Sequence, residues 1–250
     1  MDSYQYVLDS HTHTLASGHA YNTITEMAQA ATDKGLSLLA ITEHGPAMPG
    51  GPHAFYFLNL RVVRRKKAGI PVLFGCECNI IDSRGTLDLP EDALAQLDVG
   101  IASIHPPCYR SQSRDENTEA YIRAMQNPAV NIIGHPDDAR FPVDYLALVQ
   151  AAGEHHVLLE INNSSLNPNG YRPGAKENDT QMLQLCKKYE QPVILGSDAH
   201  VEEDVANFCY ADELVRSLNF PPELIANTSV DLYLSYLTSF HPESHLPGSR

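Results

Sequence analysis

The hydrophobic positions of the chain alternate between two patterns along nearly its whole length. Short apolar runs, typical of buried strands in a parallel sheet, are followed by stretches with helical periodicity. The runs predict seven strands, at residues 6–14, 36–44, 71–81, 99–105, 130–135, 157–162 and 192–198. Seven strand–helix units indicate an α/β fold, which we expect to be a distorted (βα)7 TIM-like barrel. A doubly wound open sheet is the alternative, because the closure of a sheet is not encoded in this pattern.

The intervening stretches predict helices that cover the sheet. We expect them at residues 23–34, 58–68, 91–97, 113–126, 144–155, 179–189, 202–218 and 230–240. Two of them begin with the spacing of a capping box, Thr23 to Glu26 and Ser113 to Glu116, and Gly35 is placed to end the first helix. The helix at 58–68 would be strongly basic. Residues 1–250 are expected to form one domain with its core at about 5–240 and a frayed tail after His241.

Composition narrows the classes of protein that the chain can represent. Of 250 residues, 43% are hydrophobic, but no run is long and apolar enough to predict a membrane span or a signal peptide. Five cysteines without framework spacing favour a reduced, cytoplasmic protein. A formal net charge of −14 disfavours nucleic acid as a partner. Apolar positions on the last helices are compatible with a homo-oligomer.

Metal-ligating residue types gather at the predicted strand ends. His11 and His13 are two apart on an extended strand, a spacing that places both rings on one face together with Asp9. The carboxyl ends of parallel barrel strands meet at one rim, where active sites form. A lone histidine is more often a hydrogen-bonded core residue, but that explanation does not fit histidines at so many strand ends. We therefore predict a metal centre at this rim, suited to zinc, iron or manganese, from His11, His13, His19, His44, Glu77, His105, His135, Asp198 and His200.

Neighbouring residues give further expectations about the rim. Cys76 and Cys78 flank Glu77, so we expect them to face away from the centre and pack beneath the helices. His105 and His135 each precede a proline, which favours an extended backbone at the histidine. One of Asn162 and Asn163 is expected to face the pocket. The remaining histidines, apart from His53, are expected at the surface: His155, His156, His241 and His245.

The motifs resemble those of the PHP (polymerase and histidinol phosphatase) superfamily, and most closely its stand-alone YcdX-type phosphatase branch. The segments that carry the resemblance are Asp9-Ser-His11-Thr-His13, Ala16-Ser17-x-His19-Ala20-Tyr21, Ile41-Thr-Glu-His44-Gly-Pro46, Ile104-His105, Ile133-Gly-His135-Pro136, Leu159-Glu160-Ile161-Asn162-Asn163-Ser164-Ser165, Gly196-Ser-Asp198-Ala-His200 and Phe220-Pro221-Pro222-Glu223. The resemblance implies a distorted seven-stranded barrel. The sequence departs from the family pattern at Glu43, where Asp is expected. This departure leaves the orientation of the neighbouring ligand open.

The resemblance also implies a ligand scheme with three divalent metal ions, usually zinc. His11, His13, Glu77 and Asp198 would hold the first ion. Glu77 would bridge to the second, which His105 and His135 complete. The third would be held by His19, His44 and His200.

The chemistry expected from such a centre is phosphoester hydrolysis. A water acidified between metal ions supplies hydroxide near neutral pH, so no side-chain nucleophile is needed. We expect a phosphatase that hydrolyses a small phosphate monoester, with His53 and Arg61 as candidate substrate contacts. Arg64 lies on the same predicted helix as Arg61, and a solvated helix face is the competing explanation for both. The alternatives are a histidinol-phosphate phosphatase, a nuclease or DNA-end phosphatase, and a metal-binding regulatory module without catalysis.

Overall fold

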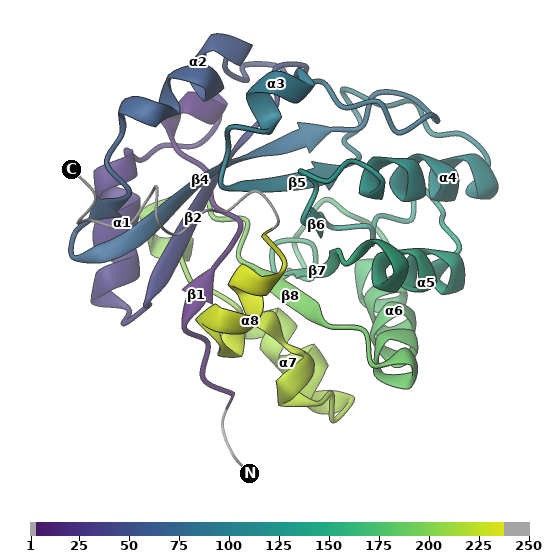
Figure 1. Cartoon of the computed structure of the whole chain (residues 1–250). Coiled ribbons are helices and arrows are strands. Elements are labelled where there is room, and N and C mark those ends of the chain that lie inside the picture. Colours follow the sequence, from purple (N-terminus) through teal and green to yellow (C-terminus); the bar gives the residue numbers. More distant parts are fainter. Residues whose placement is uncertain (1–3, 238–250) are drawn as a thin grey trace.

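The structure is a computed structural model that describes residues 4–237. Its main sheet contains the parallel strands β1 (Leu8–Asp9), β2 (Leu38–His44), β4 (Ile70–Asn79), β5 (Val99–Ser103), β6 (Ile132–Ile133), β7 (Leu158–Asn162) and β8 (Val193–Gly196). They pair in the order in which they occur along the chain (Figure 1). A parallel bridge between Thr12 and Ala199 brings the two ends of the sheet together. The result is a nearly closed barrel, so the predicted distorted (βα)7 fold is confirmed and the open-sheet alternative is wrong.

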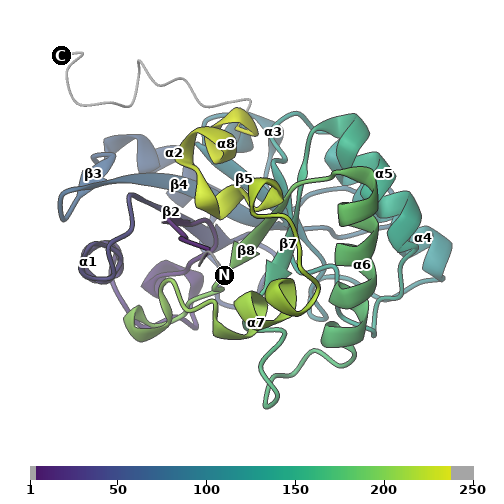
Figure 2. The same ribbon diagram turned by 90° about the horizontal axis from the view of Figure 1, so that it is seen from below.

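Helices surround the barrel on its outer side. They are α1 (Ile24–Asp33), α2 (Ala54–Asn59), α3 (Glu91–Leu94), α4 (Arg114–Met125), α5 (Tyr145–His155), α6 (Ala175–Tyr189), α7 (Cys209–Ser217) and α8 (Val230–Ser235). Short 3-10 turns occur in the connecting segments: η1 (Leu15–Ser17), η2 (Leu60–Val62), η3 (Glu202–Asp204), η4 (Pro222–Leu224) and η5 (Ala226–Thr228). Figure 2 shows the strands between α1 on one side and α4 to α6 on the other.

Local sequence signals explain where several helices begin and end. Thr23 and Ser113 form the predicted capping boxes with Glu26 and Glu116. Each hydroxyl accepts from the backbone of the third helical residue, while the glutamate accepts from the backbone of the cap. Gly35 follows α1 with a φ of 78°, a left-handed conformation that glycine adopts without a steric penalty.

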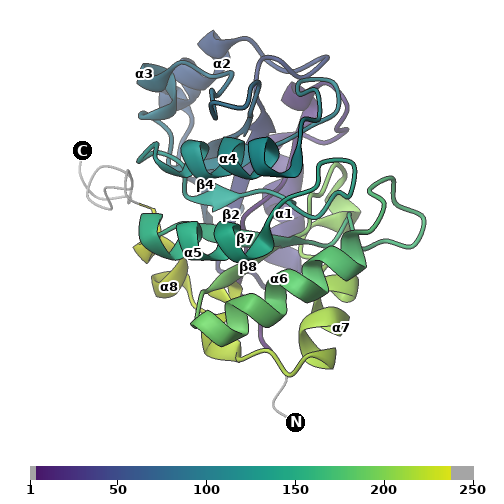
Figure 3. The same ribbon diagram turned by 90° about the vertical axis from the view of Figure 1, so that its right-hand side faces the viewer.

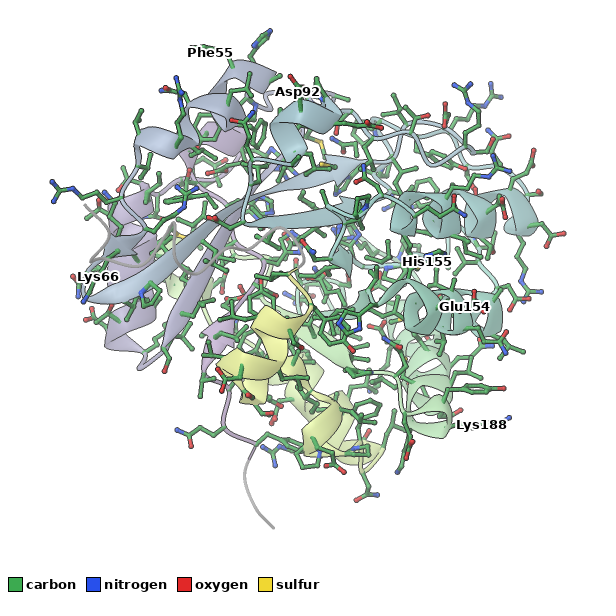
Figure 4. All side chains as sticks on the ribbon, viewed as in Figure 1. Phe55, Lys66, Asp92, Glu154, His155 and Lys188 are labelled. Carbon is green, nitrogen blue, oxygen red and sulfur yellow. The ribbon has the colours of Figure 1, made fainter. Side chains whose placement is uncertain are left out.

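The predicted basic helix at 58–68 is wrong. A helix forms earlier, as α2, and residues 66–67 instead make the short strand β3 (Lys66–Lys67), antiparallel to β4. The reversal between them uses Ala68 and Gly69, both at positive φ, a tight turn that the helical pattern does not reveal. Figure 4 shows Lys66 at the outer edge of the molecule on this hairpin, while Phe55 projects from α2.

Several other predicted helices have different bounds. α6 begins at Ala175 instead of Asp179, directly after Gly174, whose φ of 73° sets the entry of the chain. The helix predicted at 202–218 is divided into η3 and α7, which are separated by residues 205–208. The last helix ends at Ser235, and the expected frayed tail lies outside the described residues.

The barrel interior is apolar at the amino ends of the strands. Side chains from the amino-terminal halves of six strands meet there: Leu8, Leu38, Leu73, Val99, Leu158 and Ile194. α8 closes this end of the barrel by inserting Tyr233 and Tyr236 into the same cluster. In Figure 3, α8 lies at one end of the barrel and the loop that leads into α6 lies at the other. The polar rim is therefore at the end opposite α8.

Within residues 4–237, no helix combines the length and the apolar content that crossing a membrane requires.

We expect Tyr233 to contribute to stability through its ring alone. The side chain has no exposed surface, and its hydroxyl has no hydrogen-bond partner among the described residues. Tyr233→Ala should lower the free energy of unfolding by about 3–5 kcal/mol, whereas Tyr233→Phe should leave it unchanged or raise it. Urea unfolding at a fixed metal concentration measures both variants. Equal destabilisation by the two substitutions would contradict this account.

Candidate metal centre

The strands turn from apolar to polar along their inner face. Because side chains two apart share a face, Leu73 and Glu77 of β4 both point into the barrel, as do Ala40 and His44 of β2. The register pairs His44 with Glu77, so the two side chains lie side by side at the carboxyl ends of neighbouring strands. The polar side chains at the carboxyl ends of the strands therefore form the rim of the barrel.

Glu77 lies at the middle of the histidine cluster. Its Oε2 is 2.7 Å from His44 Nδ1, 3.4 Å from His11 Nε2 and 3.5 Å from His13 Nε2. Its Oε1 is 2.7 Å from His135 Nε2 and 3.1 Å from His105 Nε2. One carboxylate thus faces five imidazole rings from four different segments of the barrel.

Asp198 forms a second carboxylate position beside it. Its Oδ1 is 3.3 Å from His13 Nε2 and 3.7 Å from His11 Nε2. The His200 ring is centred 4.5 Å from that of His13 and 5.0 Å from that of His19. His19 lies on the exposed side of the cluster, on the loop that follows η1.

The donor atoms fit divalent cations. Three sets lie within 4.8 Å: His13 with His44 and His200, His11 with His13 and Asp198, and His44 with Glu77 and His105. Several of these buried atoms approach one another but form no hydrogen bond of good geometry within residues 4–237, namely His44 Nδ1, His105 Nε2 and Glu77 Oε2. Buried polar atoms are normally paired, and a cation shared between imidazole and carboxylate satisfies all of them.

The electrostatics of the cluster keep both carboxylates ionised. Burial opposes ionisation of Glu77, but the rings of His105, His11 and His44 hold its pKa well below its usual range. Burial opposes ionisation of Asp198 in the same way, and His11 and His13 hold its pKa well below normal.

The two histidines between these carboxylates differ in their pKa. Burial lowers the pKa of His13 far below its usual value, with His44 and His200 adding to the effect. Burial also disfavours protonation of His11, but Glu160, Glu77 and Asp198 raise its pKa well above normal.

Hydrogen bonds on the outer side of the rings orient the donors. His11 Nδ1 is 2.7 Å from Glu160 Oε1, and His105 Nδ1 is 2.7 Å from Asn79 Oδ1. Both partners are acceptors, so each ring carries a proton at Nδ1 and turns its Nε2 toward the cluster. Gly196 makes room for this arrangement, because a Cβ there would lie 1.8 Å from Glu160 Oε1.

The backbone is strained at two of the predicted ligands. His135 has a φ of 30° and Asp198 a φ of 56°, both in the left-handed region that non-glycine residues rarely adopt. The expectation of an extended backbone at His135 is therefore wrong, although Pro136 follows it. Strain of this kind is typical of functional sites, where the surrounding structure holds a side chain in place.

The sequence predicts Asp9, Asn162 and Asn163 near the rim, but only one of them faces the metal centre. The other two hold strands and helices together. Asp9 does not face the metal cluster. It accepts from Ser197 Oγ at 2.5 Å and from Ala206 N at 2.9 Å, and so fastens β1 to the segment after β8. Asn162 faces the centre and donates to Asp198 Oδ2 at 3.3 Å, whereas Asn163 accepts from the first turn of α7.

The predicted packing of the cysteines next to Glu77 is confirmed. Cys76 and Cys78 have no exposed surface and belong to the apolar layer between the sheet and the helices.

The centre opens into a cavity of about 270 Å³. Its lining residues come from the rim loops as well as the metal cluster: His19, His44, Met48, His105, Pro106, Pro107, Tyr171, Arg172, Asp198 and His200. His53 and Arg61, the candidate substrate contacts, are exposed and do not line this cavity. His53 instead accepts a hydrogen bond from the backbone nitrogen of Phe55 at the start of α2.

Arg172 and Glu160 are two residues that sequence reasoning did not select. The Arg172 guanidinium is 3.4 Å from Asp198 Oδ2 and 2.8 Å from Ser165 Oγ, and it is the lining residue with a fixed positive charge. No sequence signal identifies it, because it lies on an irregular loop. Glu160 could have been found, since it shares the inner face of β7 with Asn162.

Comparison with known proteins identifies relatives over most of the chain. It is 47% identical over 235 residues to a probable phosphatase of Clostridium novyi, an alignment that covers 94% of this chain and 96% of that protein. It is also 47% identical over 232 residues to a probable phosphatase of Caldanaerobacter subterraneus, with 92% and 91% covered.

Solved structures share the fold at low sequence identity. The histidinol phosphate phosphatase of Lactococcus lactis, solved with zinc, L-histidinol and phosphate, superposes with a TM-score of 0.59 at 19% identity, covering 86% of this chain and 95% of that one. A putative histidinol phosphatase of Listeria monocytogenes gives a TM-score of 0.54 at 17% identity, with 80% and 97% covered. The model of the PHP domain matches residues 9–167. The chain therefore belongs to the PHP family.

Proposed function

We propose that the protein is a metal-dependent phosphatase that hydrolyses a small phosphate monoester. The observation that carries the proposal is the position of Arg172, which lines the same cavity as the metal-ligating side chains. A guanidinium next to a cluster of cations is suited to a phosphoryl group, because it forms two parallel hydrogen bonds to phosphate oxygens. The relatives named probable phosphatases support the same chemistry.

Three divalent ions, zinc in the first instance and manganese or iron as alternatives, are the proposed cofactors. His11, His13, Glu77 and Asp198 would hold one ion, and Glu77 with His105 and His135 a second. His19, His44 and His200 would hold the third. When bound, such ions supply an acidified water as nucleophile and offset negative charge on the phosphoryl group. The three donor sets within 4.8 Å support more than one ion.

The residues of the chain would bind and orient the substrate. Arg172 is held in place by Ser165 and Asn162, at 2.8 Å and 3.3 Å, so its guanidinium is preorganised toward the cavity. The ring of Tyr171 lies 5.0 Å from this guanidinium and forms part of the cavity wall. Met48, Pro106 and Pro107 make another part of the wall apolar, so the leaving group would meet a largely uncharged surface.

The cavity argues against a polynucleotide substrate. Its volume is about 270 Å³, and Arg172 is its one fixed cation among the lining residues. The formal net charge of −14 would repel a nucleic-acid backbone outside the cavity. A regulatory module without catalysis is disfavoured because none of the nine predicted ligands is replaced. Histidinol phosphate remains a candidate substrate, supported only by a shared fold.

The remaining expectations from the sequence stay predictions. They concern a homo-oligomer, a cytoplasmic location, a single domain over residues 1–250, and substrate contacts at His53 and Arg61. Direct measurement on the purified protein would address each of them.

Removal of metal should abolish activity. We expect the purified protein to hydrolyse p-nitrophenyl phosphate, to lose this activity after treatment with a chelator, and to regain it with Zn²⁺ or Mn²⁺. Elemental analysis in parallel should give up to three ions per chain. A fully metallated protein that hydrolyses neither this ester nor any phosphorylated metabolite, L-histidinol phosphate included, would favour the regulatory module. Cleavage of oligonucleotides would favour the nuclease.

Replacement of Arg172 should weaken phosphate binding. A hydrogen bond to a charged group contributes about 1.5–3 kcal/mol, so Arg172→Ala should lower kcat/KM by about 10- to 100-fold. Inhibition by inorganic phosphate should weaken in parallel, and the metal content should be checked because Arg172 lies beside Asp198.

Two arginines serve as matched controls for this variant. Arg140 approaches the same tyrosine ring but is bound by Asp138, and Arg61 is exposed outside the cavity. Arg140→Ala and Arg61→Ala should retain activity. An equal loss in Arg61→Ala would instead support its predicted contact with substrate.

A further inference from the structure

The hydroxyl of Ser17 connects a ligand of the metal centre to a buried carboxylate behind it. It is 2.6 Å from Glu43 Oε2, 3.1 Å from His13 Nδ1 and 3.0 Å from the backbone nitrogen of His44. A hydroxyl has one hydrogen to donate and two lone pairs that accept. If its hydrogen goes to Glu43, both other contacts must be donated to Ser17. His13 then carries its proton at Nδ1.

Glu43 determines the direction in which Ser17 donates. Its carboxylate is 1% exposed and receives hydrogen bonds from the Thr14 backbone at 3.0 Å, from the Thr14 hydroxyl, from Ser17 and from Tyr56 at 3.4 Å. An ionised carboxylate accepts and cannot donate, so every neighbouring hydroxyl must point its hydrogen toward it. Glu43 lies on the outer face of β2, opposite to His44, and therefore does not line the pocket.

The consequence reaches the centre through the ring of His13. With its proton at Nδ1, the ring directs the Nε2 lone pair toward the cluster, where Nε2 is 3.1 Å from His11 Nε2 and 3.3 Å from Asp198 Oδ1. The opposite tautomer would place a hydrogen where a cation must bind. His44 is affected as well, since its backbone nitrogen donates to the same hydroxyl.

We propose that Glu43 is a positioning residue which, through the hydroxyl of Ser17, holds His13 in the tautomer that can bind a metal ion. The inference rests on the metal-binding part of the proposed function and is independent of hydrolysis. It also gives a role to the position at which the family pattern leads us to expect Asp. Thr14 separately caps η1, because its hydroxyl accepts from Ala16 N at 3.3 Å, so the Ser17 contacts are not needed for that turn.

Three variants separate this role from simple packing. Glu43→Met keeps a similar length but removes both acceptor oxygens, which frees the Ser17 hydrogen to turn toward His13. Ser17→Ala removes the acceptor itself and serves as the second test if the first variant folds poorly. Tyr56→Phe is the matched control, because it deletes another hydrogen bond to Glu43 and leaves Ser17 intact.

Two measurements that do not depend on catalysis report the outcome. Nitrogen-15 NMR of histidine-labelled, metal-free protein shows whether Nδ1 or Nε2 of His13 carries the proton, with the signal assigned from a His13→Asn variant. Titration with Zn²⁺ against a competing chelator gives the dissociation constant. We expect Nδ1–H in the wild type and in Tyr56→Phe, and a population of Nε2–H in Glu43→Met and Ser17→Ala. Zinc affinity should fall about 10- to 100-fold in those two variants only.

The proposal is overturned if Glu43→Met and Ser17→Ala keep the wild-type tautomer and zinc affinity. It is also overturned if Tyr56→Phe loses as much affinity as they do. A wild-type protein that binds zinc but hydrolyses no phosphate ester would contradict the proposed activity and leave this result intact. A wild-type protein that shows Nε2–H at His13 would contradict the inference whatever its activity.

Discussion

The structure depends on the compensation of one buried negative charge. The Glu77 carboxylate has no exposed surface, and an isolated carboxylate in such a place would be very costly. Imidazole nitrogens lie within 3.5 Å of it on five histidines: His11, His13, His44, His105 and His135. Those rings come from four segments of the barrel, so the charge is stabilised only when the whole rim is assembled. The same contacts are therefore needed both to close the barrel and to form the site.

Because side chains alternate along each strand, the barrel packs against helices on its outside and forms a polar site at one end of its inside. The outer positions, such as Ile41 and Cys76, pack beneath the helices, while the inner positions change from apolar to polar along the strand. Where the inner space is tightest, glycine replaces a side chain. A Cβ on Gly75 would lie 2.3 Å from the Val99 carbonyl oxygen, and one on Gly196 would meet Glu160. Because Gly75 and Gly196 have no side chain, the polar side chains of the rim have room to approach one another.

The parts of the fold that the sequence predicts are those governed by short-range rules. The number of parallel strands, the two capping boxes and the inward pair His11 and His13 follow from periodicity and from turn chemistry. The failures arise where a turn or a distant contact decides the outcome. The turn at Ala68 and Gly69 converts a basic helical pattern into a hairpin. Arg172 reaches the cavity from an irregular loop that has no period to extrapolate.

The left-handed backbone of two ligands shows a further limit of pattern reasoning. Pro136 favours an extended backbone at His135, but the tertiary contacts of this residue impose a φ of 30°. Its amide donates to Glu160 Oε2 at 2.8 Å and its ring approaches Glu77 at 2.7 Å. Two buried carboxylates therefore determine the conformation of this residue, and neither is its neighbour in the sequence.

The meeting of the first and last strands has a consequence for how the chain holds together. The Thr12–Ala199 bridge is the point at which the barrel closes, and it lies between His11 and His13 on one side and between Asp198 and His200 on the other. An ion held by His11, His13 and Asp198 would thus cross-link opposite ends of the polypeptide, much as a disulfide does in an oxidised protein. Loss of that ion would remove the cross-link, and the junction between β1 and β8 would then depend on the Thr12–Ala199 bridge and on the hydrogen bonds of Asp9 to Ser197 and Ala206.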